Sequence, residues 1–291
     1  FVSDILFNSN NIFKKIHCFN KTMSQSGNKF IKSMSLINLL PQKIQEELSS
    51  KSLLKVISGL SNFETQTVNK IVEAASMGGA DLIDIACKPE LVESAIGISP
   101  LPICVSSVEP KSFINSVKAG ASLIEIGNYD SFYDQGITFS EEKILNLTKE
   151  TKDLLPNIPL SVTVPHNMPI DKQVDLAIKL VLEGADIIQT EGGKSSNPYS
   201  SGIQGLLEKS VPTLAATFAI FKEFEKQSIN IPIMSASGLS EVTCPLAVSC
   251  GASAVGVGSV VNKLDDLISM VAVVRGLKES LKNSMIKEKV S

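Results

Sequence analysis

The chain has 291 residues, of which 43% are hydrophobic and 20% charged, and its formal net charge is −3. This is the composition of a globular protein with an ample core, and the negative charge argues against nucleic acid as a partner. Arg275 is the sole arginine, which nearly excludes a bidentate arginine clamp on a phosphate. The five cysteines lie far apart and there are two histidines, so neither a metal site nor a disulfide framework is expected. Because no apolar run approaches the roughly 20 residues that cross a bilayer, we expect no transmembrane segment.

Residues 1–44 differ in composition from the rest and are interpreted as an N-terminal extension. They carry six lysines and one acid, Asp4. Three interpretations remain open: an organelle-targeting segment, a disordered tail, or an arm that docks on a partner such as a thylakoid-associated protein complex. The arm would use one apolar helical face made of Ile12, Phe13, Ile16 and Phe19. Because every expected strand begins later, deleting residues 1–44 is expected to leave the melting temperature almost unchanged.

Residues 49–286 alternate between short apolar runs and amphipathic helical patterns, which is typical of βα repeats. The runs predict strands at 53–58, 82–86, 102–106, 123–127, 160–165 and 187–190, and in the stretches that begin at Ile231 and Gly251. Eight such repeats predict an all-parallel sheet covered by helices on its outside. The sequence therefore predicts an α/β fold, a single (β/α)8 TIM barrel that follows the N-terminal extension.

Helices are expected to end at small residues such as Gly78-Gly79 and to turn one apolar face towards the sheet. Between the fifth and sixth strands, the inward residues of one such helix are expected to be Val174, Ala177, Ile178, Val181 and Leu182. Two loops after strands are unusually long, at residues 128–139 and 191–202. Long loops at the C-terminal ends of barrel strands are usually functional.

Three charged residues, Lys55, Asp84 and Glu125, occupy the middle of expected strands that are otherwise apolar. Since side chains alternate between the two faces of a strand, we expect all three to point into the barrel. Buried charges must be paired. Two interpretations stay open: a lysine amine held by two carboxylates for Schiff-base or proton-transfer chemistry, or an ion-paired plug that fills one layer of the barrel.

A second group of candidates lies at the C-terminal ends of strands. His166 follows the fifth strand, and a histidine there could act as a general acid or base near neutral pH. Glu191 ends the sixth strand and shares its parity with Gln189. We therefore add His166 and Glu191 to the candidate catalytic residues, while a plain hydrogen-bonded loop histidine remains the alternative for His166.

Glycine and serine gather where the seventh and eighth strands end. In a (β/α)8 barrel the loops after these two strands commonly bind phosphate through backbone N–H groups. The candidate phosphate-binding residues are Ser237, Gly238, Gly258 and Ser259, joined by Gly192 and Gly193 in the loop after the sixth strand.

Long segments of the chain carry a resemblance to a known family. These segments are residues 54–63, 101–110, 125–133, 161–166 and 186–198. They closely resemble the hypothetical chloroplast reading frame twenty-three family, and the resemblance extends over residues 40–283. It implies an aldolase-type barrel in a plastid or cyanobacterial setting, and it supplies no reaction. We expect the protein in the chloroplast or another plastid, in the stroma or peripheral to the thylakoid membrane. More distantly, Ser235–Ser240 with Val255–Ser259 is similar to the phosphate loops of ribulose-phosphate-type barrels such as thiazole synthase.

Two functions follow as hypotheses. The first is an enzyme of lyase, isomerase or synthase type that acts on a small phosphorylated metabolite at the C-terminal face of the barrel. The second is a non-catalytic scaffold or regulatory subunit of a photosynthetic or other plastid complex. Fold alone does not choose between them, and no cofactor is implied by the sequence.

Overall fold

The computed structural model describes residues 35–127, 129–133, 135–192 and 198–288. Most of the predicted N-terminal extension, residues 1–34, therefore lies outside the described residues. Its predicted role as a targeting segment or docking arm falls on these residues and stays a prediction. Within the described part of the chain, no helix combines the length and the apolar character needed to cross a membrane.

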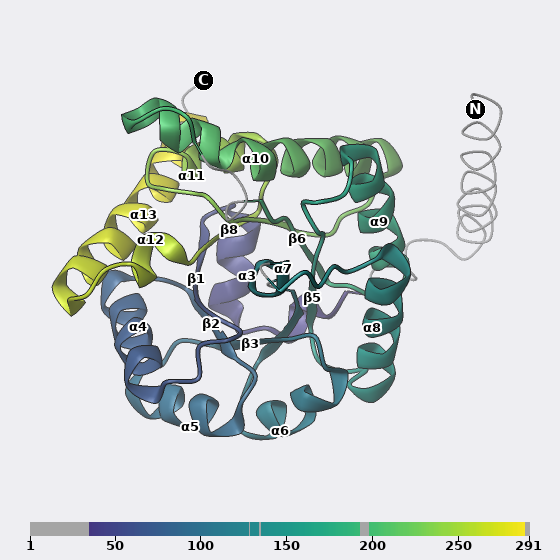
Figure 1. The fold of residues 1–291 in the computed structure, drawn as a ribbon, viewed down its shortest axis with the longest axis horizontal. Coiled ribbons are helices and arrows are strands. Elements are labelled where there is room, and N and C mark those ends of the chain that lie inside the picture. Colours follow the sequence, from purple (N-terminus) through teal and green to yellow (C-terminus); the bar gives the residue numbers. More distant parts are fainter. Residues whose placement is uncertain (1–34, 128, 134, 193–197, 289–291) are drawn as a thin grey trace. The chain divides into compact units, whose positions relative to one another are not determined.

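Eight parallel strands pair in sequence order and close into a barrel, which confirms the predicted fold. In Figure 1 the ring of strands is surrounded by helices. The strands are β1 (Leu53–Gly59), β2 (Leu82–Ala86), β3 (Ile103–Ser107), β4 (Leu123–Ile126), β5 (Leu160–Thr163), β6 (Ile187–Gln189), β7 (Ile233–Ala236) and β8 (Ala254–Val257). All of them lie within the stretches that the apolar runs predicted, to within a residue or so at each end.

The connections between strands are helical. The longer helices are α4 (Thr65–Gly78), α5 (Pro89–Ile98), α6 (Phe113–Lys118), α8 (Glu141–Leu154), α9 (Ile170–Leu182), α10 (Gly202–Gln227), α11 (Cys244–Ser249) and α13 (Leu267–Glu288). Short helices α7 (Asp130–Tyr133) and α12 (Ser259–Asn262) follow β4 and β8, and a 3₁₀ turn, η2 (Pro110–Ser112), precedes α6.

Local sequence explains where α4 begins and ends. The Glu64 side chain accepts hydrogen bonds from the N–H groups of Gln66 and Thr67 at the helix start. Gly79 ends the helix with a φ of 86°, a left-handed conformation that glycine adopts without strain. Gly78 has a different role, because a Cβ atom there would lie 2.5 Å from the Cβ of Val274 in α13. This glycine allows α4 and α13 to pack closely.

The predicted inward face of α9 was partly wrong. Ala177 and Ile178 are buried as expected, but Leu182 is 45% exposed. The buried face instead includes Leu176 and Leu180. The helix is therefore rotated about its axis relative to the inward face that the sequence predicted.

The bottom of the barrel is closed by the segment that precedes β1, namely the 3₁₀ turn η1 (Leu36–Leu39) and helix α3 (Gln42–Ser49). Leu40, Ile44 and Leu48 are at most 5% exposed. They form one cluster with the first inward residues of the strands: Leu53, Leu82, Cys104, Leu123, Ile187, Met234 and Ala254. In Figure 1, α3 is the faint helix behind the ring of strands and α7 lies in front of it.

The structure argues against the expectation that residues 1–44 could be deleted without loss of stability, because Leu40 and Ile44 belong to the core of the barrel. Residues from Leu36 onwards belong to the same compact unit as the barrel. The Leu36 N–H donates to the Asp186 carboxylate, and Lys278 of α13 donates to Glu47 of α3 at 2.8 Å. The boundary of the barrel therefore lies before α3, at about residue 36.

Candidate functional site

Lys55, Asp84 and Glu125 meet inside the barrel, as the alternation of side chains predicted. The Lys55 Nζ lies 2.6 Å from Glu125 Oε2 and 3.5 Å from Asp84 Oδ2. All three side chains are at most 1% exposed. This arrangement is a buried ion-paired group with one cation and two carboxylates.

Hydroxyl and amide groups from neighbouring strands complete this polar layer. Ser106 donates to Asp84 Oδ1 at 2.7 Å, and Ser161 donates to Glu125 Oε2 at 2.8 Å. Gln189 Nε2 donates to Glu125 Oε1 at 2.7 Å. The strand register brings them together, because Glu125 pairs with Ser106 on one side and with Ser161 on the other. Sequence analysis noted the parity of Gln189 but missed the two serines, which look unremarkable in a buried strand.

The ionic state of Lys55 favours a structural role for this layer. Burial by itself lowers the pKa of the amine, but the Glu125 and Asp84 carboxylates outweigh it and raise the pKa above its ordinary value. Lys55 therefore stays protonated near neutral pH, and a protonated amine has no lone pair with which to form a Schiff base. The protonated state of Lys55 thus favours an ion-paired layer that fills the barrel over a catalytic amine.

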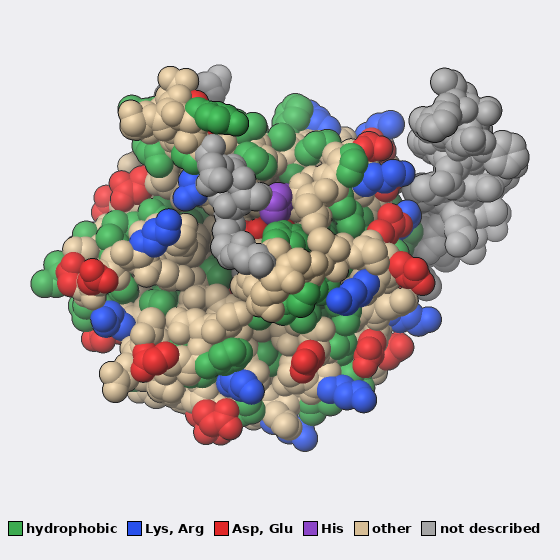
Figure 2. Space-filling model, in the orientation of Figure 1, with side chains coloured by type: hydrophobic (Ala, Val, Ile, Leu, Met, Phe, Trp, Pro, Cys, Tyr) green, Lys and Arg blue, Asp and Glu red, His purple; other side chains and the backbone are tan. Residues whose placement is uncertain are grey.

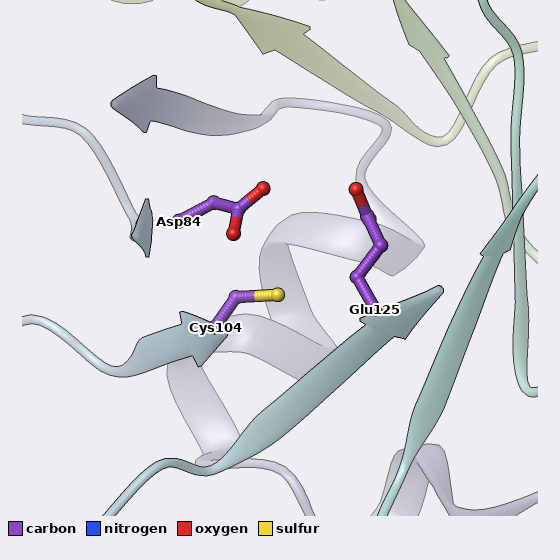
Figure 3. Close-up of side chains that lie close together, drawn as sticks. All are labelled: Asp84, Cys104 and Glu125. Atoms are coloured by element: carbon purple, nitrogen blue, oxygen red, sulfur yellow. The ribbon is translucent and has the colours of Figure 1, made fainter. Parts of the chain in front are cut away.

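Cys104 approaches the same two carboxylates. Figure 3 shows the Cys104 thiol, Asp84 and Glu125 pointing towards one another from neighbouring strands. Their ligand atoms lie within 4.8 Å of one another, which is close enough for a metal site. However, the Lys55 amine already pairs with both carboxylates, and burial raises the pKa of the Cys104 thiol well above its ordinary value. A protonated thiol beside a lysine is a poor metal ligand.

A second polar group lies at the C-terminal end of the barrel around Glu191, which is 3% exposed. Glu191 Oε1 accepts a hydrogen bond from the Asp130 N–H at 3.0 Å. Glu191 Oε2 accepts one from the Tyr133 hydroxyl at 2.8 Å and lies 3.1 Å from His166 Nδ1. Thus α7, the end of β5 and the end of β6 all meet at one carboxylate.

The Glu191 hydrogen bond is the main cause of a raised pKa for His166, and it outweighs the opposing effect of burial. His166 Nδ1 also lies 3.8 Å from Asp130 Oδ1. Burial and Glu191 together raise the pKa of Tyr133, so its hydroxyl keeps its proton. The group therefore contains a proton donor, His166, oriented by a buried carboxylate. Asp130, His166 and Glu191 also have ligand atoms within 4.8 Å of one another, so these three could hold a divalent cation only when His166 has lost its proton.

The five candidate catalytic residues are thus divided between two groups. Lys55, Asp84 and Glu125 lie in the barrel interior, whereas His166 and Glu191 lie at its C-terminal end with Asp130 and Tyr133. Asp130 and Tyr133 fall within residues 128–139, which the sequence marks only as a long loop, because no spacing along the chain predicts that α7 folds back onto Glu191.

The candidate phosphate loops after β7 and β8 lie side by side, because Ala236 of β7 pairs with Gly256 of β8. Ser237 and Gly238 follow β7 with φ values of 71° and 72°. For a serine, this left-handed conformation costs roughly 1–2 kcal/mol, and strain of this kind is often found at functional sites.

The loop after β8 is shaped by contacts with β1. Gly258 precedes α12, whose first residue is the exposed Ser259. Asn262 Nδ2 donates to the carbonyl oxygen atoms of Ile57 at 2.9 Å and Ser58 at 3.2 Å. These bonds tie the loop to the end of β1, at the same end of the barrel as Ser237 and Gly238.

Gly192 has a close packing contact that accounts for its lack of a side chain. A Cβ atom there would lie 2.8 Å from Pro212 Cβ and 3.0 Å from the Thr213 backbone nitrogen in α10. Gly193, the other candidate in this loop, lies outside the described residues. Figure 2 shows that acidic and basic side chains are intermixed around the rim of the face that carries α7.

The fold is a (β/α)8 barrel whose polar groups lie in its interior and at its C-terminal end. Solved structures with a similar fold include (S)-3-O-geranylgeranylglyceryl phosphate synthase from Thermoplasma acidophilum, at a TM-score of 0.57 and 15% identity, which covers 84% of this chain and 100% of that one. Thiamine phosphate pyrophosphorylase from Pyrococcus furiosus aligns with a TM-score of 0.54 and 15% identity, over 81% of this chain and 98% of that one. At these identities the likeness shows the fold alone.

The chain belongs to the DUF561 family, described as a protein of unknown function, whose model matches residues 39–287. Its relatives include the uncharacterized protein ycf23 of Cyanophora paradoxa, 42% identical over 84% of this chain and 98% of the relative. The ycf23 protein of Porphyra purpurea is 36% identical over 84% of this chain and 91% of the relative. These matches confirm the resemblance that the sequence motifs indicated.

Proposed function

We propose that this protein binds a small phosphorylated metabolite at the C-terminal end of its barrel and transforms it as a lyase, isomerase or synthase. The observation that carries the proposal is the pairing of Ala236 with Gly256, which sets the two glycine-containing loops side by side. Backbone N–H groups at such loops suit an anion, because no side chain stands between them and the ligand. Similar barrels whose names include a phosphorylated compound, such as hexulose-6-phosphate synthase, support the choice of ligand class.

We assign the chemical step to His166 and Glu191. The raised pKa of His166 gives it a proton to donate near neutral pH, and Glu191 fixes the orientation of the ring. Lyases, isomerases and synthases of this kind move a proton on or off a carbon or oxygen atom of the substrate, which is the task of a positioned general acid or base. The ion-paired layer formed by Lys55, Asp84 and Glu125 would have a structural role in the barrel interior beneath this site.

The proposal is tested by placing a negative charge in the phosphate loop. Gly258 has a φ of −125° and a ψ of −79°, and a Cβ atom there would lie 3.3 Å from the Ile57 carbonyl oxygen. Gly258→Ala is therefore measured beside Gly258→Asp, so that the effect of the charge is separated from that of backbone strain. Gly258→Asp should abolish the thermal stabilisation that phosphorylated ligands give to the wild type, because like charges repel. Gly97→Asp is the matched control, since Gly97 is exposed and a Cβ there meets no atom within 4 Å. Equal stabilisation of both aspartate variants by inorganic phosphate or sugar phosphates would place the site elsewhere.

We further propose a plastid location, which is supported by relatives named ycf23, a hypothetical chloroplast reading frame. Stroma and thylakoid surface remain alternatives. Co-sedimentation of the protein with isolated thylakoids distinguishes them: retention in the supernatant supports the stroma, and recovery with the membranes supports a peripheral location.

A second candidate function is that of a subunit in a larger plastid complex, and one observation favours it. Exposed apolar side chains follow one side of α10, where Ile203 is 65%, Val211 56% and Phe218 49% exposed. Their spacing of eight and seven residues places them on one helical stripe, and such a stripe suits a protein partner. If this function holds, Val211→Glu should reduce the apparent size of the protein in a native plastid extract. An unchanged size would leave the enzyme as the better proposal.

A further inference from the structure

Helix α7 lies over the C-terminal mouth of the barrel and covers the proposed acid. In Figure 1 this short helix stands in front of the ring of strands. The ring of Tyr133, the last residue of α7, packs edge-on against the His166 ring, with 5.3 Å between the ring centroids. The side chain of His166 is only 11% exposed. Because an acid must come within hydrogen-bond distance of the group that it protonates, access to His166 depends on whether α7 stays in place.

Two hydrogen bonds tie α7 to the barrel, and both end on one carboxylate. At the start of the four-residue helix, the Asp130 N–H donates to Glu191 Oε1 at 3.0 Å. At its end, the Tyr133 hydroxyl donates to Glu191 Oε2 at 2.8 Å. Glu191 is 3% exposed, so water competes little for these bonds. Both ends of α7 are therefore held through the same side chain.

The residues on either side of α7 suit a segment that pivots on a fixed base. Tyr129 and Phe139 flank the helix, are 0% and 2% exposed, and have ring centroids 4.5 Å apart. The Phe132 ring packs on Phe139 at 5.5 Å. Gly136, by contrast, has a φ of 73°, and a Cβ atom there would meet no atom within 4 Å. A glycine in open space changes its backbone conformation at little steric cost, so the chain can bend after α7 while the aromatic base stays packed.

We propose that α7 is a lid over the acid His166 and that Glu191 is its latch. This inference rests on the proposed function and specifies how access to that site is controlled. Glu191 Oε2, which accepts from the Tyr133 hydroxyl, also lies 3.1 Å from His166 Nδ1. The closed lid and the aligned acid thus share one oxygen atom. Opening of α7 exposes the His166 ring and at the same time removes a donor from the carboxylate that orients it, so that access and alignment are coupled.

Two tyrosines four residues apart provide a matched pair for the test. Tyr133→Phe removes the hydroxyl that donates to Glu191, whereas Tyr129→Phe removes a hydroxyl that has no hydrogen-bond partner among the described residues. The readout is the rate at which diethyl pyrocarbonate modifies His166, followed by peptide mass spectrometry on the high-pH plateau where imidazole is neutral. Modification of His17, the other histidine of the chain, verifies that the dose of reagent is equal.

Loss of a hydrogen bond to a charged acceptor should raise the population of the open lid, and with it the His166 rate, about tenfold or more in Tyr133→Phe. The rate in Tyr129→Phe should match that of the wild type. Equal rates in the wild type and Tyr133→Phe would overturn the latch. Equally raised rates in both variants would show a general loosening of the segment and would also overturn it.

Hydrogen exchange of the Asp130 amide, followed by NMR, examines the other end of α7. Since both ends are held by one carboxylate, Tyr133→Phe should speed the exchange of the Asp130 N–H by a factor similar to that for His166 modification. Unchanged exchange at Asp130 would mean that only the Tyr133 side chain moves, and the lid would be rejected. Neither measurement uses a ligand, so a failed lid leaves the Gly258→Asp test of the proposed function unaffected.

Discussion

Replacement of Lys55 by methionine tests how the barrel interior is held together. Methionine keeps most of the apolar stem of lysine but removes the amine that lies 2.6 Å from Glu125 and 3.5 Å from Asp84. Ser106, Ser161 and Gln189 still donate to the two carboxylates, but no cation balances them in the variant. Loss of one partner from a buried ion pair costs about 3–5 kcal/mol. For a barrel of this size, that loss lowers the melting temperature by about 6–20 °C.

The assay is urea unfolding followed by circular dichroism, because the chain contains no tryptophan. Lys43→Met is the matched control: Lys43 pairs with Asp81 at 3.5 Å, but its side chain is 64% exposed, so the effect should be small. The difference in unfolding free energy between the wild type and the Lys55→Met variant should become smaller as pH falls. Unpaired buried carboxylates have raised pKa values, and the stability they contribute is present at low pH and lost as pH rises. A Lys55→Met variant as stable as the wild type at pH 8 would refute the ion-paired plug.

Three further outcomes are expected. The pKa of His166 is raised in the folded protein, so its contribution to stability is fully present below the unfolded-state pKa of about 6.5 and is lost as pH rises through the folded-state pKa. Chemical denaturation from pH 5.5 to 9 should show this decline in the wild type. The decline should be weaker in His166→Asn. Ile44→Ala should lower the free energy of unfolding by about 2–5 kcal/mol because it opens a cavity under the barrel, whereas Leu39→Ala, at a residue 56% exposed, should change little. Gly78→Ala should destabilise by about 1–3 kcal/mol through the contact with α13, while Gly97→Ala in α5 should stabilise by up to about 1 kcal/mol; equal effects at the two glycines would contradict the close helix packing.

Much of the fold could be predicted from the sequence because each βα repeat carries its own signal. The apolar runs placed the eight strands, and alternation placed Lys55, Asp84 and Glu125 inside the barrel, where they do form ion pairs. The closed barrel also brings the ends of β7 and β8 together. These predictions needed only local periodicity and the regular geometry of a parallel barrel.

Other features depend on contacts between residues that are distant in the sequence. The segment of η1 and α3 around Ile44 that closes the bottom of the barrel was assigned to the N-terminal extension. A short amphipathic helix before the first strand gives no sign of what it covers. The contact of Tyr133 with Glu191 joins residues 58 positions apart. Among the described residues the Tyr129 hydroxyl and Gln189 Oε1 have no hydrogen-bond partner, and this cannot be predicted from a sequence because it depends on the folded surroundings.

The central claim, a phosphorylated ligand held by the loops after β7 and β8, is tested most directly by mass spectrometry of small molecules released from the protein purified under native conditions. The wild type and the Gly97→Asp control should release the same phosphorylated compound in comparable amounts. Gly258→Asp should release none of it. Equal release by all three proteins, or a released compound that carries no phosphate in the wild type, would contradict the account.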